Sequence, residues 1–281
     1  MKTITQKELN EILDLHKKWL NDEDGGKCAN LSNVDLSDVD LSGAILVGAK
    51  LSDANLLCAK LRSADLSGVI LVGTKLRGAD LSDADLTHAN LQYADLSNTD
   101  LSNTDLIYAD LSGAILRGAK LRGADLNGAD LTYANLRYAD LTHANLRYAD
   151  LKTADLSCAN ITNVTYDEQT AFFALQCPEE GSFIGYKKAK NFIVKLLITE
   201  DAKRSSATTR KCRCSKAKVL SITNLDGSES KLESICSKYD KSFIYKVGEI
   251  VEVPDFDEDR WNECSTGIHF FITRNEAVQY N

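Results

Sequence analysis

Between residues 29 and 165, apolar residues recur at every fifth position. Leucine occupies this position without interruption from Leu31 to Leu156, and Ile161 follows in the same register. Two residues before each of these centres stands a small residue, which is Ala at 21 of the 27 positions from Ala29 to Ala159. A period of five matches neither the alternation of a strand nor the 3.6-residue repeat of a helix. Two inward positions in every five residues therefore predict a solenoid, whose chain turns a corner with each unit.

The repeating unit is Ala-(Asp/Asn)-Leu-(Ser/Thr/Arg)-X, and residues 79–86 (Ala-Asp-Leu-Ser-Asp-Ala-Asp-Leu) show it without change. This unit resembles that of the pentapeptide-repeat family, over about half of the chain. The resemblance implies a right-handed quadrilateral β-helix with four units in each square coil, where Leu fills the axis and Ala packs beside it. At four units per coil the tract makes about seven coils, and ~4.8 Å per coil gives a rod ~33 Å long.

The N-terminal segment has the pattern of a helix. Thr5-Gln6-Lys7-Glu8 matches a capping box, and apolar residues follow with helical spacing at Leu9, Ile12, Leu13, His16, Trp19 and Leu20. Because an open β-helix end invites pairing with another chain, we predict that a helix over residues 5–20 covers the first coil, with Trp19 supplying bulk. A turn follows at residues 24–26. A partner-binding or dimerising helix is the alternative interpretation.

Residues 166–281 have no five-residue register and predict a small α+β module. Strands are expected at residues 192–199, 218–223, 242–247, 249–253 and 268–272, and a second capping box at residues 273–276 opens a short helix. Two of its segments, Arg210-Lys211-Cys212-Arg213-Cys214 and Trp261-Asn262-Glu263-Cys264, resemble an uncharacterised C-terminal domain of phage and bacterial pentapeptide-repeat proteins, from which no activity transfers. The module is interpreted as a cap of the last coil that could also pair protomers. The predicted fold is mainly β, divided into a capping segment (1–27), a β-helix (28–165, the repeat tract) and the module (166–281).

Charge and cysteine usage narrow the class of protein. The net charge is −8, and the repeat tract supplies most of it, with 17 Asp against 11 Lys or Arg. No apolar run approaches the ~20 residues of a membrane span, and the N-terminus lacks a signal-peptide pattern. Cys58 and Cys158 occupy equivalent positions five coils apart, roughly 24 Å, which is too far for a disulfide. These features predict a soluble cytoplasmic protein with reduced thiols and no membrane partner.

Candidate chemistry is confined to the C-terminal module. Its cysteines and His269 raise a zinc hypothesis, but Cys212 and Cys214 are separated by one residue and lack a second pair, so buried structural thiols are favoured. A cysteine nucleophile with His269 as base is a second option, although residues 267–271 are typical of a buried strand. No phosphate-binding loop, zinc-protease motif or nucleophile elbow occurs. We predict no metal, no cofactor and no enzyme activity, with an enzyme in the module as the remaining alternative.

Residues 20 apart share a face if four units form a coil. One acidic row then contains Asp65, Asp85, Asp105 and Asp125, and the adjoining face carries Asp110, Asp130 and Asp150. Asp suits this position because its side chain hydrogen-bonds nearby backbone at a corner. The family resemblance adds another interpretation, since some members are acidic rods that imitate duplex DNA and bind type II topoisomerases. Arginines interrupt the negative faces at Arg77, Arg117 and Arg137 and at Arg62 and Arg122.

Five tyrosines end their units and are predicted to point outward: Tyr93, Tyr108, Tyr133, Tyr138 and Tyr148. Together with Arg117 and Arg137 they match the composition of protein interfaces, although Tyr can also simply cover corners. The basic stretch 203–218 lies in a nearly neutral module, which favours a solvated face over a nucleic-acid site. The predicted function is a non-catalytic protein-binding or scaffolding rod with an unidentified protein partner. A DNA-mimicking topoisomerase inhibitor or protector is the alternative, and oligomeric state stays open.

Overall fold

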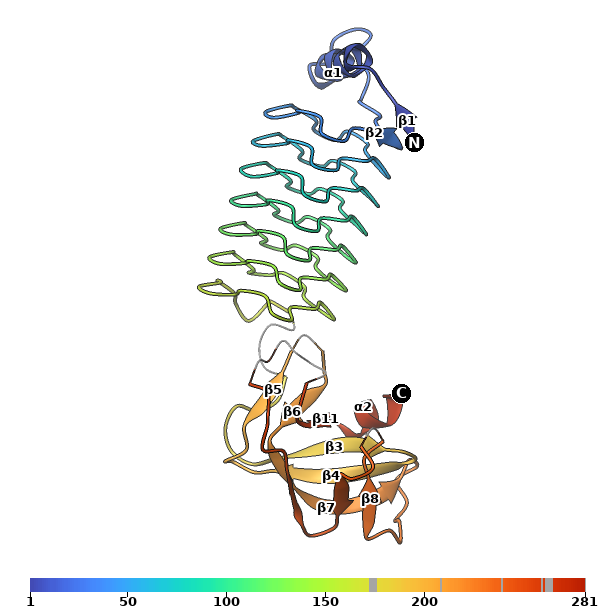
Figure 1. Cartoon of the computed structure of the whole chain (residues 1–281), viewed down its shortest axis with the longest axis vertical. Coiled ribbons are helices and arrows are strands. Elements are labelled where there is room, and N and C mark those ends of the chain that lie inside the picture. Colours follow the sequence, from blue (N-terminus) through green and yellow to red (C-terminus); the bar gives the residue numbers. More distant parts are fainter. Residues whose placement is uncertain (172–175, 208, 239, 259, 261–264, 281) are drawn as a thin grey trace. The chain divides into compact units, whose positions relative to one another are not determined.

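The computed structural model divides the chain into two compact units, Met1–Ala174 and Leu175–Asn281. It describes residues 1–171, 176–207, 209–238, 240–258, 260 and 265–280. The first unit contains strand β1 (Lys2–Thr3), helix α1 (Gln6–Leu20), strand β2 (Val34–Asp35) and the stacked coils of the repeat tract (Figure 1). The prediction of a mainly β protein with few helices is confirmed.

Backbone pairing in the repeat tract joins residues 20 apart. Parallel bridges run from Asn30–Lys50 to Asn145–Thr165 without a gap in the series. Near the middle, the Leu101 N–H donates to the Lys120 carbonyl at 2.7 Å, and the Lys120 N–H donates to the Thr99 carbonyl at 2.9 Å. The chain therefore returns to the same ladder after four five-residue units, which we call one coil.

The axis of the tract is filled by leucine. Every centre from Leu31 to Leu156 is at most 4% exposed, which accounts for the unbroken period. Thr74, Thr99 and Thr104 replace Ala and are fully buried, yet their hydroxyls donate to the carbonyls of Leu51, Leu76 and Leu81 at 2.7–2.9 Å. A buried hydroxyl is tolerated there because its hydrogen bond is satisfied.

Each unit ends in a turn whose last residue adopts a positive φ. In the unit of Tyr93, the carbonyl of Leu91 accepts from the N–H of Ala94 at 3.1 Å, and Tyr93 has φ +57°. Glycine suits this left-handed conformation, as at Gly113 (φ +66°), whereas a bulky side chain there is uncommon. The corner position therefore favours Gly or Asn on backbone grounds alone.

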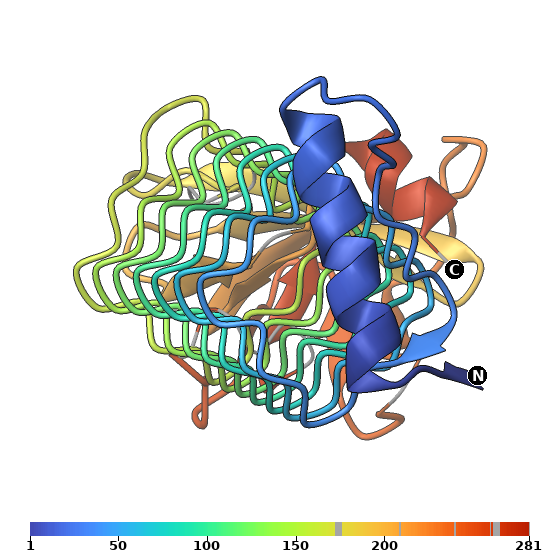
Figure 2. The same ribbon diagram turned by 90° about the horizontal axis from the view of Figure 1, so that it is seen from above.

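Helix α1 covers the first coil, as predicted, and Figure 2 shows it crossing the end of the stack. Thr5 and Glu8 form the capping box. The Ala29 N–H donates to His16 Nδ1 at 3.2 Å, and His16 is fully buried. A β-carbon at Gly26 would lie 2.4 Å from the Trp19 backbone nitrogen, so only glycine allows the chain to pass so close to the helix.

Two details of this end differ from the prediction. Trp19 stacks on His16 at 5.5 Å but remains 41% exposed, so the buried seal comes from Leu9 and His16 and not from the indole. Strand β1 was not predicted, and it pairs in parallel with β2, with Lys2 opposite Val34. The segment before the helix thus occupies an edge that the helix alone would leave open.

At the other end the ladder continues beyond residue 165. Asp150 pairs with Ala171, and the Thr170 hydroxyl donates to the Leu146 carbonyl at 2.9 Å. The offset of 21 residues shows that one residue has been inserted, which explains why the sequence register ends earlier than the pairing.

The described residues of the second unit form three antiparallel sheets and helix α2 (Arg274–Gln279). Their strand orders are β10-β7-β4-β3, β11-β6-β5 and β8-β9. The strands are β3 (Phe183–Ala189), β4 (Phe192–Ile198), β5 (Arg204–Ser206), β6 (Cys212–Cys214), β7 (Lys216–Asn224), β8 (Ser234–Cys236), β9 (Ile244–Lys246), β10 (Ile250–Glu252) and β11 (Ile268–Phe270). Tyr186 and Phe271 join the first two sheets by exchanging backbone hydrogen bonds of 2.8 Å.

The five predicted strands of this unit are confirmed as β4, β7, β9, β10 and β11, with shifted ends. The capping box of α2 is also confirmed, with Thr273 and Glu276 as its members. Strands β3, β5, β6 and β8 were not predicted, because their residues alternate weakly between apolar and polar types.

Candidate functional site

The acidic row exists as a continuous ladder. Asp65 pairs with Asp85, Asp85 with Asp105, and Asp105 with Asp125. Each carboxylate accepts the N–H two residues further on, at distances between 2.8 and 3.2 Å. These aspartates therefore form corners, as expected from their chemistry, and also align four negative charges along one edge.

Basic side chains of the tract pair with aspartates outside this row. Lys120 contacts Asp100 at 3.0 Å, Arg62 contacts Asp83 at 3.2 Å, and Lys60 lies 3.8 Å from Asp40. Within the part of the chain that the structure describes, no ion pair involves the four aspartates of the row. Its negative charge is thus left to solvent or to a partner.

The five tyrosines point to solvent, as predicted. Their exposed fractions are 51–69%, and all have φ between +55° and +60°. A left-handed conformation costs a residue with a β-carbon ~1–2 kcal/mol, and glycine would avoid that cost. Backbone preference therefore does not explain why aromatic residues occupy these corners.

The tyrosines fall in three columns of residues 20 apart. One column contains His88, Tyr108 and Tyr148, and the His88 and Tyr108 rings stack at 5.4 Å. Tyr138 belongs to another column, where Arg117 and Arg137 place their guanidinium carbons 5.5 and 5.7 Å from the centre of its ring. The third contains Tyr93 and Tyr133. The structure thus brings Tyr138 together with both arginines. It also adds His88 to the candidate surface, a residue that sequence reasoning missed although it lies 20 residues before Tyr108 and therefore in the same column.

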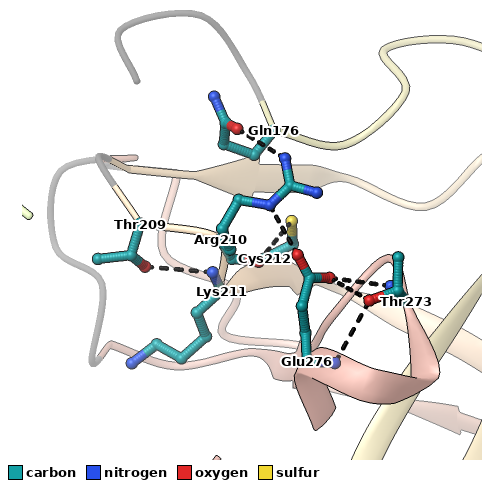
Figure 3. Close-up of polar contacts among 7 residues, drawn as sticks. All are labelled: Gln176, Thr209, Arg210, Lys211, Cys212, Thr273 and Glu276. Carbon is teal, nitrogen blue, oxygen red and sulfur yellow. Dashed lines mark hydrogen bonds and ion pairs between the residues drawn. The ribbon is translucent and has the colours of Figure 1, made fainter. Parts of the chain in front are cut away.

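The basic stretch of the second unit is largely used internally. Arg210 donates through Nε to Glu276 at 2.8 Å and through a terminal nitrogen to Gln176 at 3.1 Å (Figure 3). Arg213 is 2% exposed and donates to the carbonyls of Asp257 and Thr266. The expectation of a solvated face is therefore wrong for Arg213, because its guanidinium ties separate segments of the unit together.

The cysteines of β6 are packed as structural thiols. Cys212 and Cys214 are fully buried, and burial raises the pKa of the Cys214 thiol to about 12. A thiol with this pKa is protonated at neutral pH and is a poor nucleophile. Cys264 lies outside the described residues. In the remainder that is described, no group of three metal-ligating side chains comes together.

His269 lies in β11, within the strand predicted for residues 268–272. It is partly buried and lines a cavity of about 1050 Å³. Lys187 of β3 faces the same cavity, and sequence reasoning missed it because β3 itself was not predicted.

Profile comparisons identify both parts of the chain. The profile of pentapeptide repeats matches residues 29–68, 64–103, 94–132 and 134–165. The chain belongs to the pentapeptide-repeat family. Residues 173–277 match a second profile, described as a family of unknown function (DUF5758). None of the helices in the described part of this pentapeptide-repeat protein is long and apolar enough to cross a membrane.

Three solved structures illustrate the similarity. HetL, a pentapeptide-repeat protein involved in heterocyst differentiation regulation in the cyanobacterium Nostoc, is 39% identical over 48% of this chain and 73% of HetL, with a TM-score of 0.27. The pentapeptide-repeat protein alr5209 of Nostoc is 48% identical over 31% of this chain and 71% of its own, with a TM-score of 0.30. The plasmid-mediated fluoroquinolone resistance protein QnrB1 is 18% identical over 50% of this chain and 85% of QnrB1, with a TM-score of 0.33. Among curated proteins, none matches this chain.

Proposed function

We propose that this pentapeptide-repeat protein is a non-catalytic binding protein, whose repeat tract presents tyrosine and arginine side chains to a protein partner. The observation that carries the proposal is the placement of five exposed tyrosines in a left-handed backbone conformation. Residues that are unfavourable for the fold yet exposed are typical of functional positions.

The proposed architecture is the right-handed quadrilateral β-helix of about seven coils over residues 28–165. Residues 1–27 cap it and residues 166–281 form the α+β module. The Leu-filled axis supports a non-catalytic role, because a packed interior leaves recognition to the outer faces. The exposed thiols of Cys58 and Cys158 favour a reducing compartment such as the cytoplasm.

Tyr138 is the proposed centre of the surface. The guanidinium carbons of Arg117 and Arg137 lie 5.5 and 5.7 Å from the centre of its ring, and interface hot spots are enriched in Tyr and Arg. The cation–π contacts hold the three side chains near one another before a partner arrives, which reduces the entropy lost on binding.

The experiment compares two triple variants of the full chain as bait in lysate of the source cells. One variant carries Tyr133→Gly, Tyr138→Gly and Tyr148→Gly, and it removes aromatic side chains from corners that glycine accepts. The matched control carries Ser63→Gly, Asn98→Gly and Asn103→Gly, which makes the same change at left-handed corners without aromatic side chains.

We expect a protein that the wild type and the control capture equally, and that the tyrosine variant loses. Circular dichroism would verify that both variants remain folded. Equal capture of that protein by the tyrosine variant would show that these side chains are not the binding surface.

A second candidate function is inhibition by DNA mimicry, which the continuous row Asp65–Asp85–Asp105–Asp125 favours. Replacing all four by Asn keeps the hydrogen bond from the corner N–H while removing four charges. The matched control replaces Asp40, Asp80, Asp100 and Asp140, which occupy the same unit position in a ladder interrupted by Lys60 and Lys120.

The measurement is inhibition of supercoiling by a type II topoisomerase. If the wild type is a mimic through this row, it inhibits, the control inhibits equally, and the row variant does not. A wild type that never inhibits rejects mimicry for the enzyme tested, and equal inhibition by the row variant rejects this edge as the mimic.

A further inference from the structure

The cavity of the second unit contains more positive than negative side chains. It lies between the β3–β4 turn, the segment joining β8 to β9, and strand β11. Five lysines line its wall, against three carboxylates. Phe243, Tyr245 and Phe271 add aromatic surface to the same wall. A cavity of about 1050 Å³ is large enough for a small organic molecule.

Lys187 occupies a position in β3 where an apolar residue is expected. Side chains alternate along a strand, so Lys187 shares its face with Gly185 and Ala189. Ala189 is fully buried, and so is Val194, which pairs with Lys187 across β4. This face therefore points toward the core of the unit, and the lysine amine reaches the cavity from inside.

The contacts of Lys187 are with neutral groups. Its Nζ donates to the His269 carbonyl at 3.2 Å and lies 5.8 Å from the centre of the Tyr245 ring. Among the described residues, no carboxylate lies within ion-pair distance of it. Burial lowers the pKa of this amine to about 8, which reflects a charge without a counter-ion.

Neighbouring lysines are held differently. The Lys188 amine donates to the carbonyls of Val278 and Tyr280 at 3.0 and 2.8 Å, next to the C-terminal end of α2. The Lys211 amine lies 6.0 Å from the centre of the Tyr280 ring. Lys187 is the one placed on the core-facing side of its strand, where an anion would be shielded from water and bound more strongly.

We propose that this cavity binds a small organic anion with a planar apolar body, and that the negative group of this ligand pairs with Lys187. The aromatic wall would contact the planar body, and the surplus of lysines would draw the anion to the cavity. The ligand then supplies the counter-ion that the partly buried Lys187 lacks, so binding offsets the desolvation cost of its charge.

The test uses two aldehydes with the same ring, one with a 5′-phosphate and the other with a 5′-hydroxyl that partly closes onto the aldehyde as a cyclic hemiacetal. Pyridoxal 5′-phosphate and pyridoxal both condense with a neutral lysine amine and release water, and borohydride then reduces the imine to a stable secondary amine. Peptide mapping of the full-length protein identifies each modified lysine. A lowered pKa promotes the reaction of both aldehydes equally, and the cyclic hemiacetal of pyridoxal slows its reaction at every lysine alike. The phosphate-dependent gain at Lys187 relative to the gain at a control lysine therefore reports the anion site. Lys218, an exposed residue of β7, is the internal control.

We expect the ratio of the pyridoxal 5′-phosphate rate to the pyridoxal rate to be at least about tenfold higher at Lys187 than at Lys218. Equal ratios at the two lysines would overturn the proposal. So would a phosphate-dependent gain confined to another lysine.

A binding measurement covers the case of a poorly reactive amine. Pyridoxine 5′-phosphate has the same ring and phosphate but no aldehyde, and calorimetry would measure its affinity. We expect Lys187→Arg to retain binding within about threefold and Lys187→Met to weaken it at least about tenfold, since only Arg keeps the charge. Unchanged affinity in a folded Lys187→Met variant would reject the assignment.

Discussion

The ring of Tyr108 lies over the backbone of Gly128, one coil further along the tract. A β-carbon at Gly128 would stand 2.4 Å from Tyr108 Cε1, closer than such atoms approach one another. Tyr93 and Gly113 repeat the relationship in a neighbouring column, at 2.7 Å. At these two positions a tyrosine corner rests on a glycine corner of the next coil, so the choice of one residue constrains the other.

We predict that Gly128→Ala destabilises the protein more than Gly68→Ala. Both glycines belong to one column and have φ of +67° and +62°. Each variant therefore loses ~1–2 kcal/mol of stability by placing alanine in the left-handed conformation. Only Gly128→Ala must also displace a ring, because nothing lies within 4 Å of a β-carbon at Gly68. Urea denaturation measures both costs. Equal values would mean that the Tyr108 ring does not rest on Gly128 in solution.

The leucine axis predicts a large effect of truncation near mid-tract. Leu101 is fully buried between neighbouring coils that are fixed by ladders, so Leu101→Ala leaves a cavity that cannot collapse and costs ~2–5 kcal/mol. Ser102→Ala, at the adjacent partly exposed position, removes a hydroxyl and is expected to cost less than ~1 kcal/mol. An unchanged denaturation midpoint for Leu101→Ala would contradict the packed axis.

The repeat tract could be predicted from the sequence because one local rule recurs in every unit. Each Leu and each Ala has the same surroundings as its counterpart 20 residues away. The repeat period therefore suffices to predict which residues contact one another. Helix α1 was predictable for a similar reason, since Thr5 and Glu8 cap it through neighbours three residues apart. The exposure of Trp19 was not, because it depends on the space left by Leu9 and His16 over one particular coil.

The second unit shows where such reasoning ends. Arg213 can be buried because its guanidinium donates to the carbonyls of residues 257 and 266. These residues are more than 40 positions away, so the sequence pattern around Arg213 does not predict the contact. Lys187 looks like a surface residue until β4 and β9 place Val194 and Tyr245 beside it. The candidate site therefore arises from long-range packing, whereas the tyrosine columns follow from the period alone.

The partly buried Lys187 also predicts a pH-dependent difference in stability between the wild type and Lys187→Met. The pKa of Lys187 is about 8 in the folded protein against the usual 10.5, chiefly through burial, with Lys211 lowering it further and Cys214 acting in the opposite direction. Below pH 8 both states carry the proton, so the folded state bears the full burial penalty. Between pH 8 and 10.5 the unfolded chain binds a proton that the folded chain has released, and the penalty falls as pH rises.

Lys187→Met should therefore be more stable than the wild type at pH 7, by ~1–3 kcal/mol at about 1.4 kcal/mol per pKa unit, and this advantage should shrink between pH 8 and 10.5. Pulse proteolysis of the second unit in urea would measure both proteins across this range. Taking the difference between them removes the separate titration of Tyr245, whose pKa is raised by burial. The pKa of Cys214, which burial raises to about 12, lies above this pH range. A constant difference from pH 7 to pH 10 would show that Lys187 titrates normally and that its amine is solvated.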